Sequence, residues 1–384
     1  MDVLLVDPAV RFLERDRPIA KTYPHIGLAY VATALASAGF RVRVLDVNAA
    51  SLESRELEAE LRAARPALVA MSAMTYSVRD AYSLAALARA VAPEAVTVLG
   101  GVHATLLPRE TLEECPHLDV VIQGEGEVAA TRLAELVVGG EYPAGLDRIP
   151  GVFFRGGEGP PPAPVEDLDA LPFPDWGLYR YETYARVYSR RFGARIPLFQ
   201  LNTRRGCPFS CTFCSPLHGE RVRFRSPASV VREMEENLGR HGARHFDLAD
   251  SNATLDRGRF LDLCGSLVRS GLAREVSWNI DTGVRLVDRD LLRAAREAGC
   301  EMVSLGVESG DDQMLRRMNK GFTRREAEEA VRAAVEAGLA VKLSFVLGHP
   351  FETRETARRT FEFARELRER YGVEYYYNLV DVYP

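Results

Sequence analysis

The sequence predicts an α/β protein with two domains, a doubly wound parallel sheet followed by a partial β/α barrel. Apolar strand-like runs alternate with amphipathic helical runs, a proline- and glycine-rich stretch interrupts the alternation once, and the alternation then resumes. A chain of 384 residues has room for two or three domains. Its 47% hydrophobic and 27% charged residues exclude disorder as its main character.

Residues 1–140 are the first predicted domain. Strands that alternate with helices pair in parallel, and such a sheet binds ligands outside the carboxyl ends of its strands. Those ends are rich in glycine and small polar residues, so a bulky cofactor can approach the backbone. The predicted strands are 3–7, 41–47, 67–72, 96–100 and 119–123, and the predicted helices are 28–38, 53–65, 79–91 and 127–138.

Residues 141–195 are predicted to be a linker. Residues 156–164 combine glycine with four prolines, and residues 171–176 add two more. Proline has no N–H to donate to a strand ladder, so we expect no regular sheet here. The apolar residues of the second stretch indicate that it lies along a surface.

Residues 196–384 are the second predicted domain, a partial barrel. Glycine follows the expected end of each helix, at 242, 271, 299, 338 and 372, as is usual for a helix C-cap. A closed barrel needs eight strands, so with six predicted strands either the barrel is incomplete or the sequence is part of a longer protein. The strands are 198–203, 245–249, 275–280, 302–307, 341–347 and 374–379, and the helices 227–241, 258–270, 288–298, 324–337 and 354–370.

Three clustered cysteines carry the chemical information. Cys207, Cys211 and Cys214 have the spacing C-x3-C-x2-C in the loop after the first strand of the second domain. Three thiolates on so short a loop can hold one iron–sulfur cluster, and three ligands leave one iron of a four-iron cluster open. The alternative is a zinc site completed by His218, although no second cysteine pair accompanies it.

The other three cysteines, Cys115, Cys264 and Cys300, are isolated in apolar segments and are predicted to be buried structural thiols. Five arginines flank the cysteine cluster and are candidates for binding carboxylates, but exposed charges are the norm and most are expected to be solvated. They are residues 204, 205, 221, 223 and 225.

The composition also limits the partners. A net charge of −5 argues against a protein that coats nucleic acid. The longest nearly apolar stretch, 28–40, is too short to cross a bilayer, and no basic-then-apolar leader precedes it. We therefore expect a cytoplasmic protein with no nucleic-acid or membrane partner, since its cysteine usage also fits a reducing compartment.

The cysteine motif, with Phe213 before the last cysteine, resembles that of the radical S-adenosylmethionine superfamily. Residues 250–252, 305–310, 319–321 and 346–353 resemble later segments of that superfamily, except that His349 stands where an apolar residue is more common. The resemblance implies that a [4Fe-4S] cluster binds S-adenosylmethionine at its open iron and cleaves it to a 5′-deoxyadenosyl radical. It also implies an electron donor such as flavodoxin or ferredoxin, and contacts to S-adenosylmethionine from Phe213, Asp250, Glu308 and Gly348.

The first domain resembles that of the cobalamin-binding subgroup, through residues 24–30, 100–105, 124–127 and 168–174. The D-x-H-x-x-G signature is absent, because Asp7 is followed by Pro8 and then by residues 9–12 without histidine. We therefore expect base-off cobalamin with no protein imidazole on cobalt. His25 and His103 are candidates for corrin neighbours or for hydrogen-bonded loop histidines. The resemblance implies cobalamin contacts from Ser72, Thr75, Gly100, Gly101, His103, Gly124 and Glu125.

These resemblances imply an enzyme that methylates an unactivated carbon of a small biosynthetic molecule, using the radical and a methyl group carried by cobalamin. Radical cyclisation, oxidation or rearrangement assisted by cobalamin is the alternative within enzymes. A non-catalytic module that binds cobalamin or an iron–sulfur cluster is the alternative outside them.

Overall fold

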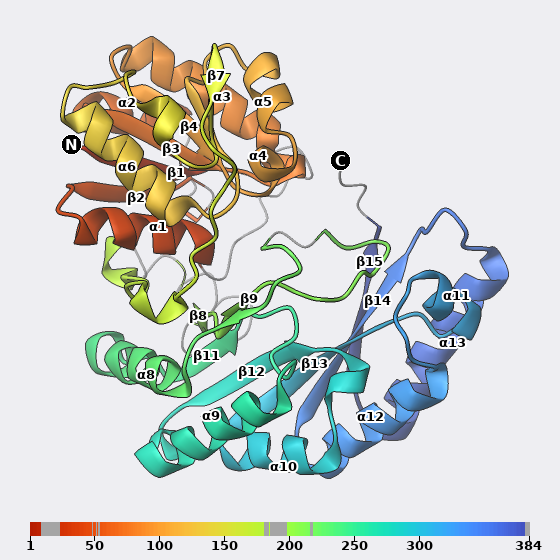
Figure 1. Ribbon diagram of the computed structural model, residues 1–384. Helices are drawn as coiled ribbons and strands as arrows, with labels where there is room; N and C mark the ends of the chain where they lie inside the picture. Colours follow the sequence, from red (N-terminus) through yellow and green to blue (C-terminus); the bar gives the residue numbers. More distant parts are fainter. Residues whose placement is uncertain are drawn as a thin grey trace. The chain divides into compact units, whose positions relative to one another are not determined.

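The structure is a computed structural model that describes residues 1–8, 24–47, 49–50, 52, 54–179, 184, 198–215 and 218–380. It divides into two compact units, the first up to residue 197 and the second from Leu198 (Figure 1). Each unit has its own sheet, and the first unit includes the described part of the predicted linker. The part of the predicted linker at 180–183 and 185–195 lies outside the described residues.

The first unit contains a doubly wound sheet with the strand order β2-β1-β3-β4-β5-β6-β7. The first five strands pair in parallel, as predicted, and the order reverses between β1 and β3. Every residue of β1 is buried, because helices cover both faces of the sheet. The five strands are β1 (Val3–Asp7), β2 (Val42–Asp46), β3 (Leu68–Ser72), β4 (Val96–Gly100) and β5 (Val120–Ile122).

Two helices, α1 (Ile26–Ser37) and α6 (Gly126–Val138), pack against each other on one face of this sheet (Figure 1). The apolar side chains of four others form the core on the opposite face. Two of these four, α4 and α5, are missing from the prediction, since five to seven residues are too few to show a helical period. The four are α2 (Ser54–Ala64), α3 (Val78–Val91), α4 (Val102–Leu106) and α5 (Pro108–Glu114).

The structure differs from the linker prediction at two short strands. β6 (Val152–Phe154) pairs antiparallel with β5, and β7 (Gly157–Glu158) pairs antiparallel with β6. The four prolines begin only after this hairpin, so its backbone N–H groups remain available to the ladder. Further along, Trp176 is fully buried. This part of the predicted linker is therefore packed against the rest of the first unit.

The second unit contains six parallel strands in the order β15-β14-β13-β12-β11-β8, as the partial barrel predicts. The helices that connect the strands lie along one face of this sheet (Figure 1), as the right-handed rule for parallel connections predicts. Trp278, Phe246 and Phe345 are fully buried. The strands are β8 (Leu198–Leu201), β11 (His245–Leu248), β12 (Ser277–Thr282), β13 (Cys300–Glu308), β14 (Ala340–Leu347) and β15 (Glu374–Leu379).

The helices of the second unit end where the glycines predict. All five predicted capping glycines have positive φ angles between 63° and 95°, which only glycine adopts readily. A two-stranded ribbon, β9 (Arg204–Arg205) with β10 (Arg223–Phe224), is an addition to the prediction. The helices are α8 (Pro227–His241), α9 (Arg257–Ser270), α10 (Arg289–Glu297), α11 (Asp312–Arg317), α12 (Arg324–Glu336) and α13 (Arg354–Tyr371).

No helix among the described residues is long and apolar enough to span a membrane.

Gly101 lies where the loop after β4 approaches the loop after β3. Its φ is +91°, and a Cβ atom would lie 2.6 Å from Ser72 Oγ and 2.8 Å from Ala73 N. Gly39 has a φ of +93° but open space around the same position. We expect G39A to lose about 1–2 kcal/mol of stability from backbone strain, and G101A to lose about 1–3 kcal/mol more from overlap.

Thermal unfolding of the full chain, followed by calorimetry, measures both variants against the parent. Both glycines have a φ angle near +90°, so the difference between the variants reports what is particular to Gly101, the close approach of the two loops together with its ψ of −168°. Equal shifts of Tm for G39A and G101A would contradict the packing described here.

Candidate functional site

Three loops meet at the carboxyl edge of the first sheet, where the sequence predicts a cofactor. The Ala73 N–H donates to Gly100 O at 3.2 Å, and the His103 N–H donates to Ala73 O at 3.1 Å. The Gly124 N–H donates to Thr105 Oγ1 at 3.1 Å. These bonds join the loops after β3, β4 and β5, so the predicted cobalamin contacts on them share one edge of the sheet.

His103 is the most distinctive side chain at this edge. It is 6% exposed, and its Nδ1 lies 3.3 Å from Thr75 Oγ1. Its Nε2 is buried and has no hydrogen-bond partner among the described residues. Burial lowers the pKa of His103, so the ring is neutral at neutral pH. An unpaired buried nitrogen in the short helix that follows β4 fits a polar group of a bound cofactor.

The structure gives two other predicted residues local contacts. Glu125 Oε2 accepts a hydrogen bond from the Val165 N–H at 2.8 Å, which ties a later segment to the loop after β5. His25 caps α1, because its Nδ1 accepts from the Leu28 N–H at 3.0 Å. The prediction about the missing histidine signature rests on residues 9–12, which lie outside the described residues.

The cysteine loop of the second unit is held by hydrogen bonds at its start and its middle, and one more bond closes a turn within it. The Cys207 N–H donates to Gly219 O at 3.0 Å, and the Cys214 N–H donates to Cys211 O at 3.1 Å. In the middle, the Thr212 N–H donates to Met318 O at 3.2 Å. Asn319 Nδ2 donates to Ser210 O at 3.0 Å. The loop therefore lies against the turn that follows α11.

The three clustered thiols are free and accessible, whereas Cys115, Cys264 and Cys300 are buried, as predicted. Cys207 and Cys211 are half-buried, and Cys214 is exposed. Burial raises the pKa values of Cys211 and Cys214, the neighbouring thiols raise them further, and Lys320 lowers them. The pKa values of Cys211 and Cys214 thus depend on the neighbouring thiols and on the Lys320 ammonium group.

Among the described residues, no three histidine, cysteine, aspartate or glutamate side chains form a group that could hold a metal ion. In a four-iron cluster each thiolate binds a different iron, so its ligands need not converge on one point. Three free thiols within eight residues, close to the Lys320 ammonium group, therefore fit such a cluster as a donor set.

Glu308 and Phe213 lie together, as the resemblance implies for two residues of one site. Glu308 ends β13 with a φ of +68°, and its Oε1 is 3.2 Å from Lys320 Nζ. Its Oε2 accepts from Ser344 Oγ at 3.1 Å. The same Lys320 Nζ lies 5.7 Å from the centre of the Phe213 ring. This largely buried ion pair places one positive and one negative group beside the cysteine loop.

Lys320 lies in the segment 319–321, which resembles the superfamily, but no role is predicted for it from the sequence. A signal was present, because the chain has three lysines among 49 basic residues and uses arginine elsewhere. Lys320 presents a compact ammonium group, which differs in shape from the planar guanidinium of arginine.

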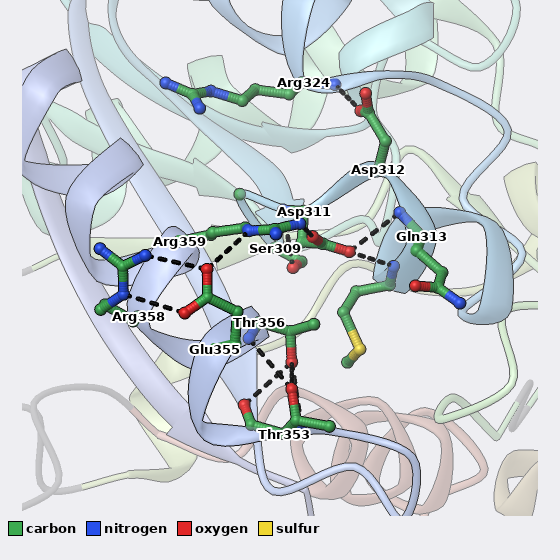
Figure 2. A network of polar contacts seen from close by, with 12 residues as sticks. Ser309, Asp311, Asp312, Gln313, Arg324, Thr353, Glu355, Thr356, Arg358 and Arg359 are labelled. Atoms are coloured by element: carbon green, nitrogen blue, oxygen red, sulfur yellow. Dashed lines mark hydrogen bonds and ion pairs between the residues drawn. The ribbon is translucent and has the colours of Figure 1, made fainter.

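The loop between Glu308 and α11 is fixed by contacts from α13, shown in Figure 2. The Asp311 carboxylate accepts from the Gln313 and Met314 N–H groups at 2.9 Å and so caps α11. Its other oxygen accepts from Arg359 Nη1 at 2.8 Å. Gly310 packs so closely on α13 that a Cβ atom would lie 2.6 Å from Phe363 Cβ. These contacts hold α11, and with it the turn carrying Lys320.

Asp250 has contacts other than those implied by the resemblance. Its carboxylate accepts from the N–H groups of Thr203 at 3.0 Å and Arg204 at 3.2 Å. It therefore supports the chain entering the cysteine loop. Asn252, two residues on, lies nearer the cysteines, with its Nδ2 3.6 Å from Cys207 Sγ.

The expectation that most flanking arginines are solvated is wrong. Arg204, Arg205, Arg223 and Arg225 are each 4–5% exposed. Arg225 shows the reason, because it forms a buried ion pair with Glu233 of α8 and donates to Asn202 O at 3.0 Å. A buried guanidinium with these partners fixes the end of β8 to α8.

Gly348 and His349 follow β14 at the same edge of the sheet. Gly348 has a φ of +89°, and its N–H donates to Glu352 Oε2 at 2.6 Å. His349 is 5% exposed, and its ring lies 5.6 Å from that of Phe213. Phe213 therefore contacts His349 directly, and Lys320 lies between Phe213 and Glu308. Asp250 instead holds the residues that enter the cysteine loop.

Comparisons with known proteins give the family. Residues 17–134 match the B12 binding domain, and residues 201–364 match the Radical SAM superfamily. The anaerobic magnesium-protoporphyrin IX monomethyl ester cyclase of Cereibacter sphaeroides is 35% identical over 90% of this chain, which spans 57% of that cyclase. The uncharacterized methyltransferase PH0819 of Pyrococcus horikoshii is 30% identical, with coverage of 96% of this chain and 78% of the relative.

A solved structure shows the same fold. The radical S-adenosylmethionine methyltransferase TsrM from Kitasatospora setae, with tryptophan substrate and a cofactor analogue bound, matches with a TM-score of 0.77 at 23% identity. The match covers 98% of this chain and 72% of that chain. Both halves of the prediction are therefore confirmed, and the chain belongs to the family of cobalamin-dependent radical S-adenosylmethionine enzymes.

Proposed function

We propose that the protein methylates an unactivated carbon of a small molecule, using cobalamin, a [4Fe-4S] cluster and S-adenosylmethionine. The presence of both cofactor-binding domains in one chain carries this proposal. Methylation is favoured by the similarity to PH0819, which is named a methyltransferase. The match to this chain covers 78% of the length of PH0819. The cyclase relative is covered over only 57% of its length.

In this proposal Cys207, Cys211 and Cys214 hold the cluster and leave one iron open for the amino and carboxylate groups of S-adenosylmethionine. When bound, the cluster supplies the electron that generates the 5′-deoxyadenosyl radical, and cobalamin carries the methyl group to the substrate. The chain orients these groups and excludes water. Lys320 stabilises the thiolates by its charge, since it lowers the pKa values of Cys211 and Cys214.

The Glu308–Lys320 pair supplies both charges that the amino-acid end of S-adenosylmethionine requires. Its groups are 3.2 Å apart and largely buried, so each is oriented before the cofactor arrives. Gly348 lets S-adenosylmethionine lie close to the backbone, because glycine has no side chain. Its φ of +89° is also unfavourable for other residues. Asp250 acts at a distance, by holding Thr203 and Arg204 at the entry to the cysteine loop.

The cobalamin contacts are assigned to the edge formed by the loops after β3, β4 and β5. Ser72, Gly100, Gly101 and Gly124 give a backbone surface with small side chains, on which a corrin ring or its tail can lie. Thr75 and His103 give polar groups in contact with each other. Glu125 shapes the edge through its bond to Val165.

The partners follow from this chemistry. We propose a small-molecule substrate, an electron donor such as flavodoxin or ferredoxin, and a cytoplasmic location, because free thiols and a reduced cluster need a reducing compartment. Radical cyclisation is the second candidate, favoured by the 35% identity to the cyclase of Cereibacter sphaeroides.

Changing any clustered cysteine should remove the cluster. We expect C207A, C211A and C214A, reconstituted anaerobically, to lose most of their bound iron and the visible absorption near 400 nm, because each thiolate holds a different iron. The matched control is C264A, which removes a buried thiol of α9 and should keep the iron content of the parent. Iron retained in all three cluster variants, or a zinc-loaded parent, would contradict the assignment.

The products formed from S-adenosylmethionine separate the two candidate reactions. Methylation consumes one molecule to make the radical and a second to restore the methyl group, so 5′-deoxyadenosine and S-adenosylhomocysteine should form in comparable amounts. Liquid chromatography with mass spectrometry on anaerobic turnover mixtures measures both. 5′-Deoxyadenosine without S-adenosylhomocysteine would remove methyl transfer and favour cyclisation. Neither product, from protein loaded with all three cofactors, would favour a binding module.

A further inference from the structure

Phe209 is an exposed aromatic residue between two of the proposed cluster ligands. It stands two residues from Cys207 and two from Cys211, and 43% of its surface is exposed. Pro208 beside it is exposed as well. Exposed apolar side chains that occur singly are normal, so Phe209 indicates a function only together with its neighbours.

Two arginines at the end of α11 share a surface with this part of the loop. Arg316 and Arg317 are both exposed. Thr212 Oγ1 donates to Arg317 O at 3.4 Å, and Asn319 Nδ2 donates to Ser210 Oγ at 2.9 Å. Both bonds are exposed, so the loop and the end of the helix form one continuous surface. We define the arginine–aromatic surface as Pro208, Phe209, Arg316 and Arg317.

Neighbouring acids do not neutralise this surface. Neither Arg316 nor Arg317 forms an ion pair with a described residue. Arg317 lies 5.4 Å from the centre of the Phe351 ring, a contact that orients the guanidinium and leaves its charge. Asp311 is paired with an arginine of α13, and Asp312 lies at the opposite end of α11. The helix end beside the cysteine loop therefore carries two unpaired positive charges.

We propose that the arginine–aromatic surface docks an acidic one-electron carrier protein that reduces the cluster. The inference rests on the proposed function, because it takes Cys207 and Cys211 as cluster ligands. An apolar centre beside charged groups, with aromatic residues and arginine enriched, is typical of protein interfaces. Positive charge also speeds association with an acidic partner.

The electron transfer needs no bond to form or break. One electron passes from the carrier to the cluster, so the carrier is oxidised by one electron while the cluster is reduced by one. A carrier that covers Phe209 lies directly beside two thiolate ligands. The bland alternative is that the two arginines only complement the dipole at the end of α11. That alternative gives them no effect on the rate of reduction.

Stopped-flow mixing of the anaerobically reconstituted full chain with a reduced, acidic flavodoxin tests the docking. Loss of the absorption near 400 nm follows the reduction of the cluster. At low ionic strength we expect R316E/R317E to be reduced about tenfold more slowly than the parent, because repulsion replaces attraction. The difference should shrink at high ionic strength, since salt screens exposed charges.

R293E/R332E is the matched control. It makes the same change of charge at two exposed arginines of α10 and α12 that likewise lack an ion pair within the described part of the chain. We expect this variant to be reduced by flavodoxin as fast as the parent. Photoreduced deazariboflavin, a small neutral reductant that needs no docking surface, should reduce the parent and both variants at equal rates.

Three results would overturn the proposal. The first is an equal rate of flavodoxin reduction for the parent and R316E/R317E. The second is slow reduction of R316E/R317E by deazariboflavin as well, since the substitutions would then disturb the cluster itself. The third is a parent that deazariboflavin reduces and flavodoxin does not.

Calorimetric titration of the same proteins with flavodoxin separates this proposal from the proposed function. We expect R316E/R317E to bind flavodoxin about tenfold more weakly than R293E/R332E. A parent that binds flavodoxin through these arginines but never cleaves S-adenosylmethionine supports the docking surface and contradicts the enzyme. A parent that cleaves S-adenosylmethionine, with flavodoxin affinity unchanged in R316E/R317E, keeps the enzyme and contradicts the docking surface.

Discussion

The contact between the cysteine loop and the turn after α11 is the interaction on which the site depends. The loop from Cys207 to Cys214 has no helix or strand of its own, so its shape is fixed from outside. Thr212 bonds to Met318, and Asn319 bonds to Ser210, so one turn holds the middle of the loop. The next residue of that turn is Lys320, whose ammonium group reaches both Glu308 and the Phe213 ring.

The turn itself is fixed by the fold around it. Asp311 caps α11 and is held by Arg359 of α13, while Gly310 packs directly on α13. A chain of contacts therefore runs from a long surface helix, through a capped short helix, to the residues beside the thiols. The parallel pairing of β13 and β14 brings their carboxyl ends together, so Glu308 and Gly348 lie at one edge of the sheet.

Periodicity and capping signals predicted most of the regular structure. Long amphipathic helices such as α8 and α12 begin and end within a residue of the prediction, because their glycine caps and apolar spacing agree. Short elements were missed, since α4, α11 and the β6–β7 hairpin are too brief to show a period. The prolines after β7 also led to a predicted linker that includes β6 and β7, whose residues form strands.

The candidate site was predictable in kind but not in its contacts. Spacing identified the three cysteines, and the resemblance brought in Glu308 and Phe213. Sequence spacing carries no information on which long-range partner a carboxylate finds, so the bonds of Asp250 to Thr203 and Arg204 were not foreseen. The same holds for Lys320, which meets Glu308 across twelve residues, and for the buried pair of Arg225 with Glu233.

Mössbauer spectroscopy of the full chain, reconstituted with ⁵⁷Fe and measured before and after S-adenosylmethionine is added, tests the central claim most directly. Three thiolate-bound irons and one open iron predict a cluster in which a single site, one quarter of the iron, changes its parameters when the cofactor binds. Four sites that stay unchanged on addition of the cofactor would contradict the account.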